Sequence, residues 1–410
     1  MKHFAEILGT VLAAGVLLSA AAYAAPTILN AASSGLPTVS PDDPLPELTA
    51  HSAIIMEAST GQILYSRNID ERRYPASTTK MMTLIVALEK GNPDDVVTVS
   101  KYAAGTDGST LWLEQGDRIP LNDLLYGLIM MSGNDAAVAI AEHIAGTETR
   151  FAAMMTDKAG EIGAKDTNFV NPHGLPDDKH YTTARDLARI AAYGYKNPRF
   201  AEIVSRKEMT LPWIKDPAHF WRNENQILWL YEGANGIKTG YTDLAGRCLA
   251  AGAKRDGVQL VTVVLDSLYM WNDTIALLDY GFKHITRKKI VADDEKIETL
   301  PVVSGWKKSV VIRAKNEVEV PLFDNQSADK FRREVELPAF LEAPLKEGET
   351  VGKLRIMYDD KEVAAVDLIA DRAVERKSFF LSLYKFLKGL WKDGGAAAKD
   401  YRPSRNCVQT

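Results

Sequence analysis

A serine and a lysine three residues apart open a long apolar stretch, at a spacing suited to nucleophilic catalysis. Ser77 and Lys80 precede the apolar run 81–88, and Pro75 and Ser77 are residue types found where helices begin. Residues i and i+3 share one face of a helix, so the two side-chain ends can come within hydrogen-bonding distance. A neutral amine can then accept the hydroxyl proton, and the helix N-terminus can stabilise an oxyanion.

Two later motifs strengthen this interpretation, because a Ser-x-x-Lys spacing alone also occurs in helices whose lysine is simply solvated. Ser132-Gly133-Asn134 follows the apolar run 124–131, where it could also be a helix cap. Lys238-Thr239-Gly240 is predicted to start a strand-like stretch ending at residues 248–251, where it could also be a turn. Three such motifs in this order, separated by 55 and 106 residues, favour a serine acyl-transfer site.

The motifs resemble those of the low-molecular-mass penicillin-binding proteins, which act as serine-type D-Ala-D-Ala carboxypeptidases. The matching strings are Pro-Ala-Ser-Thr-Thr-Lys at 75–80, Ser-Gly-Asn-Asp-Ala at 132–136, Asn-Pro-His-Gly-Leu at 171–175 and Gly-Ile-Lys-Thr-Gly-Tyr-Thr-Asp at 236–243. The resemblance covers roughly residues 49–390. It implies an α/β (α+β) transpeptidase and β-lactamase-like catalytic domain with a β-rich stalk behind it.

The catalytic residues expected from these motifs are Ser77, Lys80 and Ser132. Ser77 would attack the carbonyl between two D-alanines of a peptidoglycan stem peptide, and Lys80 would take the hydroxyl proton. Ser132 would relay a proton between Lys80 and the departing amine. The resemblance implies an oxyanion hole formed by the backbone N–H groups of Ser77 and Tyr241.

The expected substrate-binding residues are Asn134, Lys238, Thr239, Gly240 and the Tyr241 just named. Asn134 offers a donor and an acceptor to the substrate backbone. Lys238 would attract the terminal carboxylate, Thr239 would hydrogen-bond to it, and Gly240 would let the strand approach the substrate closely. Burial and the charge of Lys238 should lower the pKa of Lys80.

One stretch departs from the family pattern. Familiar members carry Asn-Arg-Asn before the Lys-Thr-Gly strand, and the arginine helps to grip the carboxylate, whereas this chain has Asn223-Glu224-Asn225. An inward-pointing glutamate would repel a carboxylate. Arg222 or Arg247 is then the candidate replacement, with Lys238 and Thr239 alone as the alternative.

Neither a metal nor a cofactor is expected. The seven histidines form no pattern of metal ligands. His173 is interpreted as bracing a loop, since Lys80 already fills the position of the base.

The composition is that of a soluble globular protein with at least two domains. The chain has 410 residues, of which 46% are hydrophobic, so it can bury a large core. A net charge of −5 argues against a nucleic-acid partner. The only two cysteines, Cys248 and Cys407, lie in unlike contexts, and no disulfide is expected between them.

The N-terminus predicts export across the cytoplasmic membrane. Residues 1–24 combine Lys2, an apolar stretch and an Ala-Tyr-Ala cleavage pattern, as in a signal peptide, with an uncleaved anchor as the alternative. Residues 25–48 are rich in Pro, Ser and Ala and indicate an extended linker. Both alternatives place the remainder on the periplasmic or cell-wall side.

The remaining chain divides into a catalytic domain at 49–286 and a small β-domain at 287–372. A hairpin at 53–65 and apolar strands near 258–265 flank a helical middle, which suggests a sheet assembled from both ends of the domain. Short alternating runs separated by turn residues characterise the second domain.

The last segment predicts peripheral membrane attachment. Residues 373–393 are assigned to an amphipathic helix whose lysines would meet anionic headgroups, and residues 394–410 to a disordered tail. It is too short and too charged to span a bilayer, and a helix docked on the protein's own surface is the alternative.

Two other functions are alternatives to a carboxypeptidase. A β-lactamase-like hydrolase needs a deacylating glutamate, usually in Glu-x-x-Leu-Asn, and the nearest string, at 208–212, lacks the asparagine and reads as a strand. A non-catalytic peptidoglycan-binding scaffold would have lost the nucleophile or base, and this chain keeps both. The expected ligands are therefore peptidoglycan stem peptides and β-lactams.

Overall fold

The fold is that of a computed structural model, which describes residues 46–214, 219–324, 326–377, 383–384 and 388. The predicted signal peptide, almost all of the linker at 25–48, most of the predicted C-terminal helix and the tail at 394–410 lie outside the described residues. Within the described ranges, no helix combines the length and apolar character needed to cross a membrane.

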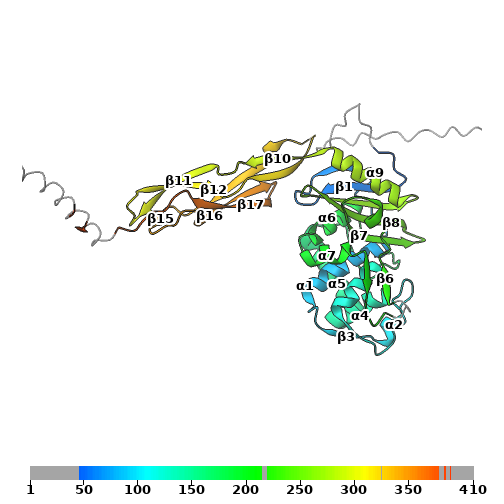
Figure 1. The fold of residues 1–410 in the computed structure, drawn as a ribbon. Coiled ribbons are helices and arrows are strands. Elements are labelled where there is room, and N and C mark those ends of the chain that lie inside the picture. The colour runs from blue at the N-terminus through cyan, green and yellow to red at the C-terminus, as the bar shows by residue number, and fades with distance from the viewer. Residues whose placement is uncertain (1–45, 215–218, 325, 378–382, 385–387, 389–410) are drawn as a thin grey trace, which may run out of the picture. The chain divides into compact units, whose positions relative to one another are not determined.

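A five-stranded antiparallel sheet forms the centre of the catalytic part. Its order is β2-β1-β9-β8-β7, so strands from both ends of the domain lie side by side, as the sequence predicted (Figure 1). The strands are β1 Ser52–Glu57, β2 Ile63–Arg67, β7 Ala234–Thr242, β8 Gly246–Arg255 and β9 Val258–Ser267. This order leaves β7 at one edge of the sheet, and β7 carries the Lys-Thr-Gly motif.

Helices and short strand pairs fill the chain between β2 and β7, and α9 follows β9 (Figure 1). The 3-10 helix η1 Ala76–Thr79 leads into α1 Lys80–Lys90. The remaining helices are α2 Lys101–Ala104, α3 Leu121–Met130, α4 Asn134–Ala145, α5 Glu148–Ile162, α6 Ala184–Gly194, α7 Pro198–Ser205, α8 Ile227–Leu230 and α9 Met270–Lys283. Two antiparallel strand pairs complete this part. β3 Val96–Thr98 pairs with β4 Arg118–Pro120 across a segment that contains α2, and β5 Glu208–Thr210 pairs with β6 Phe220–Arg222.

The two faces of the sheet bury two separate cores because side chains alternate along each strand. In β1, Ile54 and Met56 pack into the large core shared with the helical middle. Ala53 and Ile55 point to the other face, where they join Leu277 and other residues of α9. The catalytic motifs of α1 and α4 therefore sit on elements held by the larger of these cores.

Side-chain caps mark the N-termini of three helices. The Thr147 and Thr183 side chains accept hydrogen bonds from Arg150 N and Asp186 N, which caps α5 and α6. Asn197 caps α7 in the same way, and Pro198 follows it as the first helical residue. These caps account for where α5, α6 and α7 begin.

Between residues 285 and 377, the described residues form β-strands and connecting segments apart from one short 3-10 helix. One sheet has the order β14-β16-β17-β12-β11-β15, and β10 pairs with β13 in a second. The strands are β10 Ile285–Val291, β11 Lys296–Val303, β12 Ser309–Ala314, β13 Val318–Phe323, β14 Phe331–Glu336, β15 Leu341–Glu342, β16 Thr350–Tyr358 and β17 Lys361–Ala370. The 3-10 helix is η2 Ala328–Lys330.

The β-domain continues beyond its predicted end, so the expectation of a helix from residue 373 is wrong for residues 373–377. Val374 is buried and bridges to Leu345, and Lys377 N donates to Ser304 O. The apolar side chain at position 374 completes the β-domain core, which holds the backbone extended. The sequence pattern after residue 373, with apolar residues at helical spacing and basic residues from Arg376, does not indicate that this valine is buried.

Replacing Phe151 with alanine should lower the free energy of unfolding by about 3–5 kcal/mol, because this fully buried α5 side chain would leave a cavity in the large core. Thr149→Ala, on the exposed face of the same helix, is the matched control and should change stability little. Urea unfolding monitored by circular dichroism would measure both. Equal effects of the two substitutions would contradict the assignment of Phe151 to the core.

Candidate active site

The nucleophile lies in a 3-10 turn instead of the α-helical first turn that the sequence predicted. The turn covers Ala76–Thr79, and α1 begins at Lys80. Residues i and i+3 eclipse each other in a 3-10 helix, so the predicted proximity survives the change. The Ser77 Oγ atom lies 3.0 Å from the Lys80 Nζ atom.

The Lys80 amine is enclosed by protein. The residue is 0% exposed, and its Nζ contacts Asn134 Oδ1 at 2.7 Å and the His173 carbonyl oxygen at 2.8 Å besides Ser77. Burial holds the pKa of Lys80 well below its ordinary value, and the charge of Lys238 lowers it further. Glu224 and Asp135 act in the opposite direction. The net effect favours the neutral amine, which is the form that can accept a proton.

The second motif joins α3 to α4. Ser132 has a left-handed backbone (φ 60°) and is 3% exposed. The Asn134 amide is engaged at both ends, since its Oδ1 accepts from Lys80 and its Nδ2 donates to Asp107 O at 2.6 Å. Asn134 therefore holds the Lys80 amine in place, a contact that the sequence analysis did not anticipate.

Asp135 is a structural residue of the site that the sequence analysis missed. Its fully buried carboxylate accepts hydrogen bonds from Leu111 N, Leu113 N and the Thr110 hydroxyl at 2.6 to 3.1 Å. These bonds fix the loop before β4 against the start of α4. Asp135 stands inside the string that carries the family resemblance, but no spacing rule marks an aspartate as a loop anchor.

The third motif lies within β7, and the single strand-like stretch expected from residue 238 to 251 proves to be two strands. Residues 243–245 turn the chain from β7 into β8, and Gly240 pairs with Cys248 across them. A Cβ atom on Gly240 would lie 2.9 Å from Ser77 N. Glycine at this position therefore allows β7 to pack directly against the turn that carries the nucleophile.

Lys238 and Thr239 are neighbours in β7, and their side chains contact each other. Lys238 is 1% exposed and donates to Thr239 Oγ1 at 3.3 Å. Burial lowers the pKa of Lys238 to about 8, against an opposing effect of Glu224. Near neutral pH, this side chain is therefore mostly protonated and can attract an anion.

The side chains of Tyr241 and of the two candidate arginines have different partners. Tyr241 is 60% exposed and donates from its hydroxyl to Asp243 at 2.9 Å. The Arg247 guanidinium lies 5.9 Å from the Tyr241 ring centre, whereas Arg222 lies 4.6 Å from that of Trp229. Of the two candidate replacement arginines, Arg247 is therefore the one beside the Lys-Thr-Gly strand.

Glu224 acts on both site lysines. Its backbone N–H donates to Met130 O at 3.0 Å, next to the Ser132 motif, and its side chain is exposed. Its negative charge raises the pKa of Lys80 and of Lys238. The glutamate thus contributes negative potential at the place where the family pattern has an arginine.

Among the described residues, no group of three or more His, Cys, Asp and Glu side chains is arranged to hold a metal ion. Cys248 is buried, and burial raises the pKa of its thiol to about 12. Cys407 lies outside the described residues.

Comparisons with known proteins agree with this geometry. The D-alanyl-D-alanine carboxypeptidase family matches residues 38–268, and the C-terminal domain of penicillin-binding protein 5 matches residues 286–376. The chain is 35% identical over 366 residues to the D-alanyl-D-alanine carboxypeptidase DacA of Haemophilus influenzae, which covers 84% of this chain and 91% of the relative. The chain belongs to the D-alanyl-D-alanine carboxypeptidase family.

Other members of the carboxypeptidase family extend the match. The Bacillus subtilis D-alanyl-D-alanine carboxypeptidase DacF is 31% identical, with coverage of 83% of this chain and 90% of the relative. The crystal structure of penicillin-binding protein 5 from Haemophilus influenzae superimposes with a TM-score of 0.59 at 33% identity, covering 83% of this chain and 100% of that chain. These matches bear out the predicted family and its two-part α/β and all-β fold.

Replacing Glu224 with glutamine should move the acidic limb of the pH–acylation profile to lower pH, by about half a unit. Removing the negative charge lowers the pKa of Lys80, so the amine stays neutral to a lower pH. The rate of acylation by a fluorescent penicillin, followed from pH 5 to 10, would test this. Glu232→Gln, an exposed glutamate before β7, is the control, and a shift toward higher pH in Glu224→Gln would contradict the argument.

Proposed function

We propose that this protein is a serine-type D-Ala-D-Ala carboxypeptidase that forms an acyl-enzyme on Ser77 and releases the terminal D-alanine of peptidoglycan stem pentapeptides. Removing that residue would limit cross-linking during cell-wall synthesis. The observation that carries the proposal is the buried Lys80 amine 3.0 Å from the Ser77 hydroxyl. The names of the relatives point to the same substrate.

The surroundings of Lys80 favour its action as a base. The Asn134 Oδ1 and the His173 carbonyl oxygen can only accept hydrogen bonds, so they take the two N–H groups of the neutral amine. The lone pair is then left for the Ser77 O–H. As the serine oxygen attacks the scissile carbonyl, its proton passes to Nζ and the carbonyl electrons move onto the oxygen. The backbone N–H groups of Ser77 and Tyr241 are proposed to stabilise that oxyanion.

The tetrahedral intermediate collapses by expelling the D-alanine amine. In this proposal Ser132 relays the proton from Lys80 to the leaving nitrogen, and its buried position at the end of α3 supports the role. Water then attacks the acyl carbonyl while Lys80 takes one of its protons. The acyl–oxygen bond to Ser77 breaks as Lys80 returns that proton to the Ser77 oxygen, which regenerates the free serine.

Strand β7 is proposed to bind the substrate backbone. It lies at the edge of the sheet, where an extended peptide can pair with an exposed strand. Lys238 and Thr239 would receive the terminal carboxylate, Gly240 permits close approach, and Arg247 adds a nearby positive charge. Asn134 is available to the substrate only if its bond to Asp107 or to Lys80 is exchanged.

The same groups would bind β-lactams, which mimic the D-Ala-D-Ala bond and acylate the serine. A β-lactamase-like activity is less favoured because the string considered for its deacylating glutamate forms β5, Glu208–Thr210, paired with β6. The kept nucleophile and base, in contact with each other, disfavour a purely binding scaffold.

Replacing Ser77 with alanine should abolish covalent labelling by fluorescent penicillin and the release of D-alanine from a pentapeptide, while the protein stays folded. Lys80→Ala should slow acylation by roughly 100-fold or more, because the hydroxyl proton loses its acceptor. Mass spectrometry of the labelled protein and of the peptide products would measure both. Labelling of a different serine in Ser77→Ala would refute the assignment.

The remaining part of the proposal concerns location. A family that acts on peptidoglycan works outside the cytoplasm, and residues 1–24 have the composition of an export signal. We propose that the segment after residue 377 attaches the protein to the outer face of the cytoplasmic membrane. Its support is the sequence, in which aromatic and leucine residues alternate with lysines at helical spacing.

A chain ending at Lys377 should leave the membrane fraction without losing activity on soluble peptides. This end point retains Val374, which completes the β-domain core. Reversing Lys385, Lys388 and Lys392 to glutamate should also favour the soluble fraction, because each basic residue near an anionic surface contributes about 1 kcal/mol. The control reverses three exposed lysines of the β-domain, Lys307, Lys308 and Lys353. Fractionation after signal cleavage would decide, and a truncated chain that still sediments with membranes would place the anchor elsewhere.

A further inference from the structure

The His173 carbonyl is one of the two groups that orient the Lys80 amine toward Ser77. A backbone carbonyl has no side-chain rotamer of its own, so its position depends entirely on the turn that contains it. The orientation of the Lys80 amine toward Ser77 therefore depends on residues 171–175, which belong to the loop between α5 and α6.

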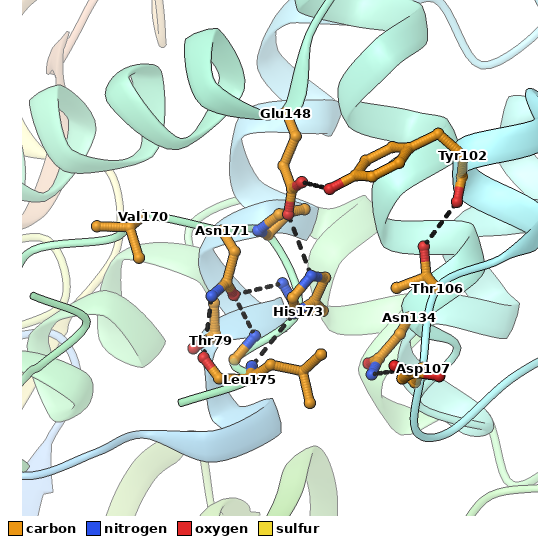
Figure 2. Close-up of polar contacts among 12 residues, drawn as sticks. Thr79, Tyr102, Thr106, Asp107, Asn134, Glu148, Val170, Asn171, His173 and Leu175 are labelled. Carbon is orange, nitrogen blue, oxygen red and sulfur yellow. Dashed lines mark hydrogen bonds and ion pairs between the residues drawn. The ribbon is translucent and has the colours of Figure 1, made fainter. Parts of the chain in front are cut away.

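Asn171 and Gly174 shape this turn (Figure 2). The Asn171 Oδ1 accepts from Gly174 N at 2.7 Å and from His173 N at 3.3 Å, and its Nδ2 donates to Leu175 O at 2.9 Å. Gly174 has φ 95°, and a Cβ there would lie 1.9 Å from the Ala76 carbonyl oxygen. The turn thus packs against the residue that precedes the nucleophile and reaches the base at the same time.

The His173 imidazole ties the turn to a helix. Its Nδ1 accepts the Leu175 N–H at 3.2 Å, so the ring proton must be on Nε2, which lies 3.1 Å from Glu148 Oε1. Burial lowers the pKa of His173, against the opposing effect of its hydrogen bond to Glu148. The ring is therefore neutral, with one nitrogen accepting and the other donating.

Glu148 receives a second hydrogen bond on its other oxygen. Tyr102 OH donates to Glu148 Oε2 at 2.7 Å (Figure 2). Burial acts to raise the pKa of the Glu148 carboxyl, yet the bonds from His173 and Tyr102 hold it below its ordinary value. The carboxylate therefore remains charged and accepts from both partners.

Tyr102 leads back to the site by a second route. Its carbonyl accepts from the Thr106 hydroxyl at 3.3 Å, and the next residue, Asp107, accepts from Asn134 Nδ2. Asn134 in turn accepts from Lys80. The two groups that accept from the Lys80 amine, the Asn134 side chain and the His173 carbonyl, are thus connected by one chain of contacts. This chain runs through Asp107, Tyr102 and Glu148.

We propose that Glu148 and Tyr102 are positioning residues for the general base, which together fix the two acceptor oxygens that aim the Lys80 lone pair at Ser77. They touch neither Ser77 nor Lys80 and act through His173 and through the loop that ends at Asp107. This inference rests on the proposed role of Lys80.

The test compares Glu148→Ala with Glu148→Gln in the full-length protein. Glutamine keeps an oxygen acceptor for His173 Nε2 and a partner for Tyr102, whereas alanine removes both. Glu89→Ala is the matched control, because Glu89 in α1 also accepts from a tyrosine, Tyr193, at 2.7 Å, but at the far end of that helix from Ser77. The readouts are the penicillin acylation rate per titrated active site from pH 5 to 10, and the melting temperature.

Glu148→Ala should acylate roughly 10- to 100-fold more slowly per active site. The acidic limb of its pH–acylation profile should also move to lower pH. A His173 carbonyl that is less firmly placed stabilises the protonated form of Lys80 less, which lowers the pKa of Lys80. Glu148→Gln should stay within about threefold of the native protein with an unmoved limb, and Tyr102→Phe should fall between the two. Glu89→Ala should acylate normally whatever its melting temperature.

The inference would be overturned if Glu148→Ala lowered only the number of titrated active sites. In that case the remaining sites would be acylated at the native rate, with the native acidic limb of the pH profile, and the role of Glu148 would be purely structural. An equal loss in Glu148→Gln would also overturn it, because charge and not positioning would then be responsible. If the native protein itself is not acylated on Ser77, the proposed function fails. If it is acylated and Glu148→Ala matches it, only the positioning role fails.

Discussion

The burial of two lysine amines in one site is the constraint on which the remaining structure depends. An ammonium group removed from water is costly unless it is neutralised or hydrogen-bonded, and a second cation nearby raises the cost for both. For Lys80, this cost is reduced because burial favours the neutral amine and because two oxygen atoms accept its hydrogen bonds. For Lys238, burial lowers the pKa only to about 8, with Glu224 opposing that effect as it does for Lys80.

The fold supplies this environment from three distant segments. The nucleophile and base come from η1 and α1, the Asn134 amide from the start of α4, and Lys238 from the edge strand β7. Each segment is held from behind: α4 by Asp135 and its three bonds to one loop, and β7 by the close contact of Gly240 with the turn at Ser77. The base is thus held by fixed oxygen acceptors, and β7 forms one edge of the sheet beside it.

The sequence predicted the parts of the site that reside in side-chain type and order. Ser77, Lys80 and the apolar periodicity of the helices needed no coordinates, and the pairing of the two ends of the domain followed from where the strands lay. Other parts could not be predicted. The sequence does not distinguish the His173 carbonyl from any other, and Asp135 accepts from a hydroxyl and from backbone N–H groups 22 to 25 residues away. Whether Ser77 sits in a 3-10 or an α-helical turn depends on packing against β7, which is distant in the chain.

The sheet topology has a consequence for the order in which this enzyme becomes active. Strand β1 pairs with β9, with Ser52 opposite Leu265 at one end and Glu57 opposite Leu260 at the other. About 200 residues must therefore be synthesised between the two strands. Such non-local pairing folds slowly, and one edge of β1 stays open meanwhile. Lys238 belongs to the late strands, so a partly assembled chain lacks the cation that helps to keep Lys80 unprotonated. The site therefore acquires this second cation only once β7 has joined the sheet.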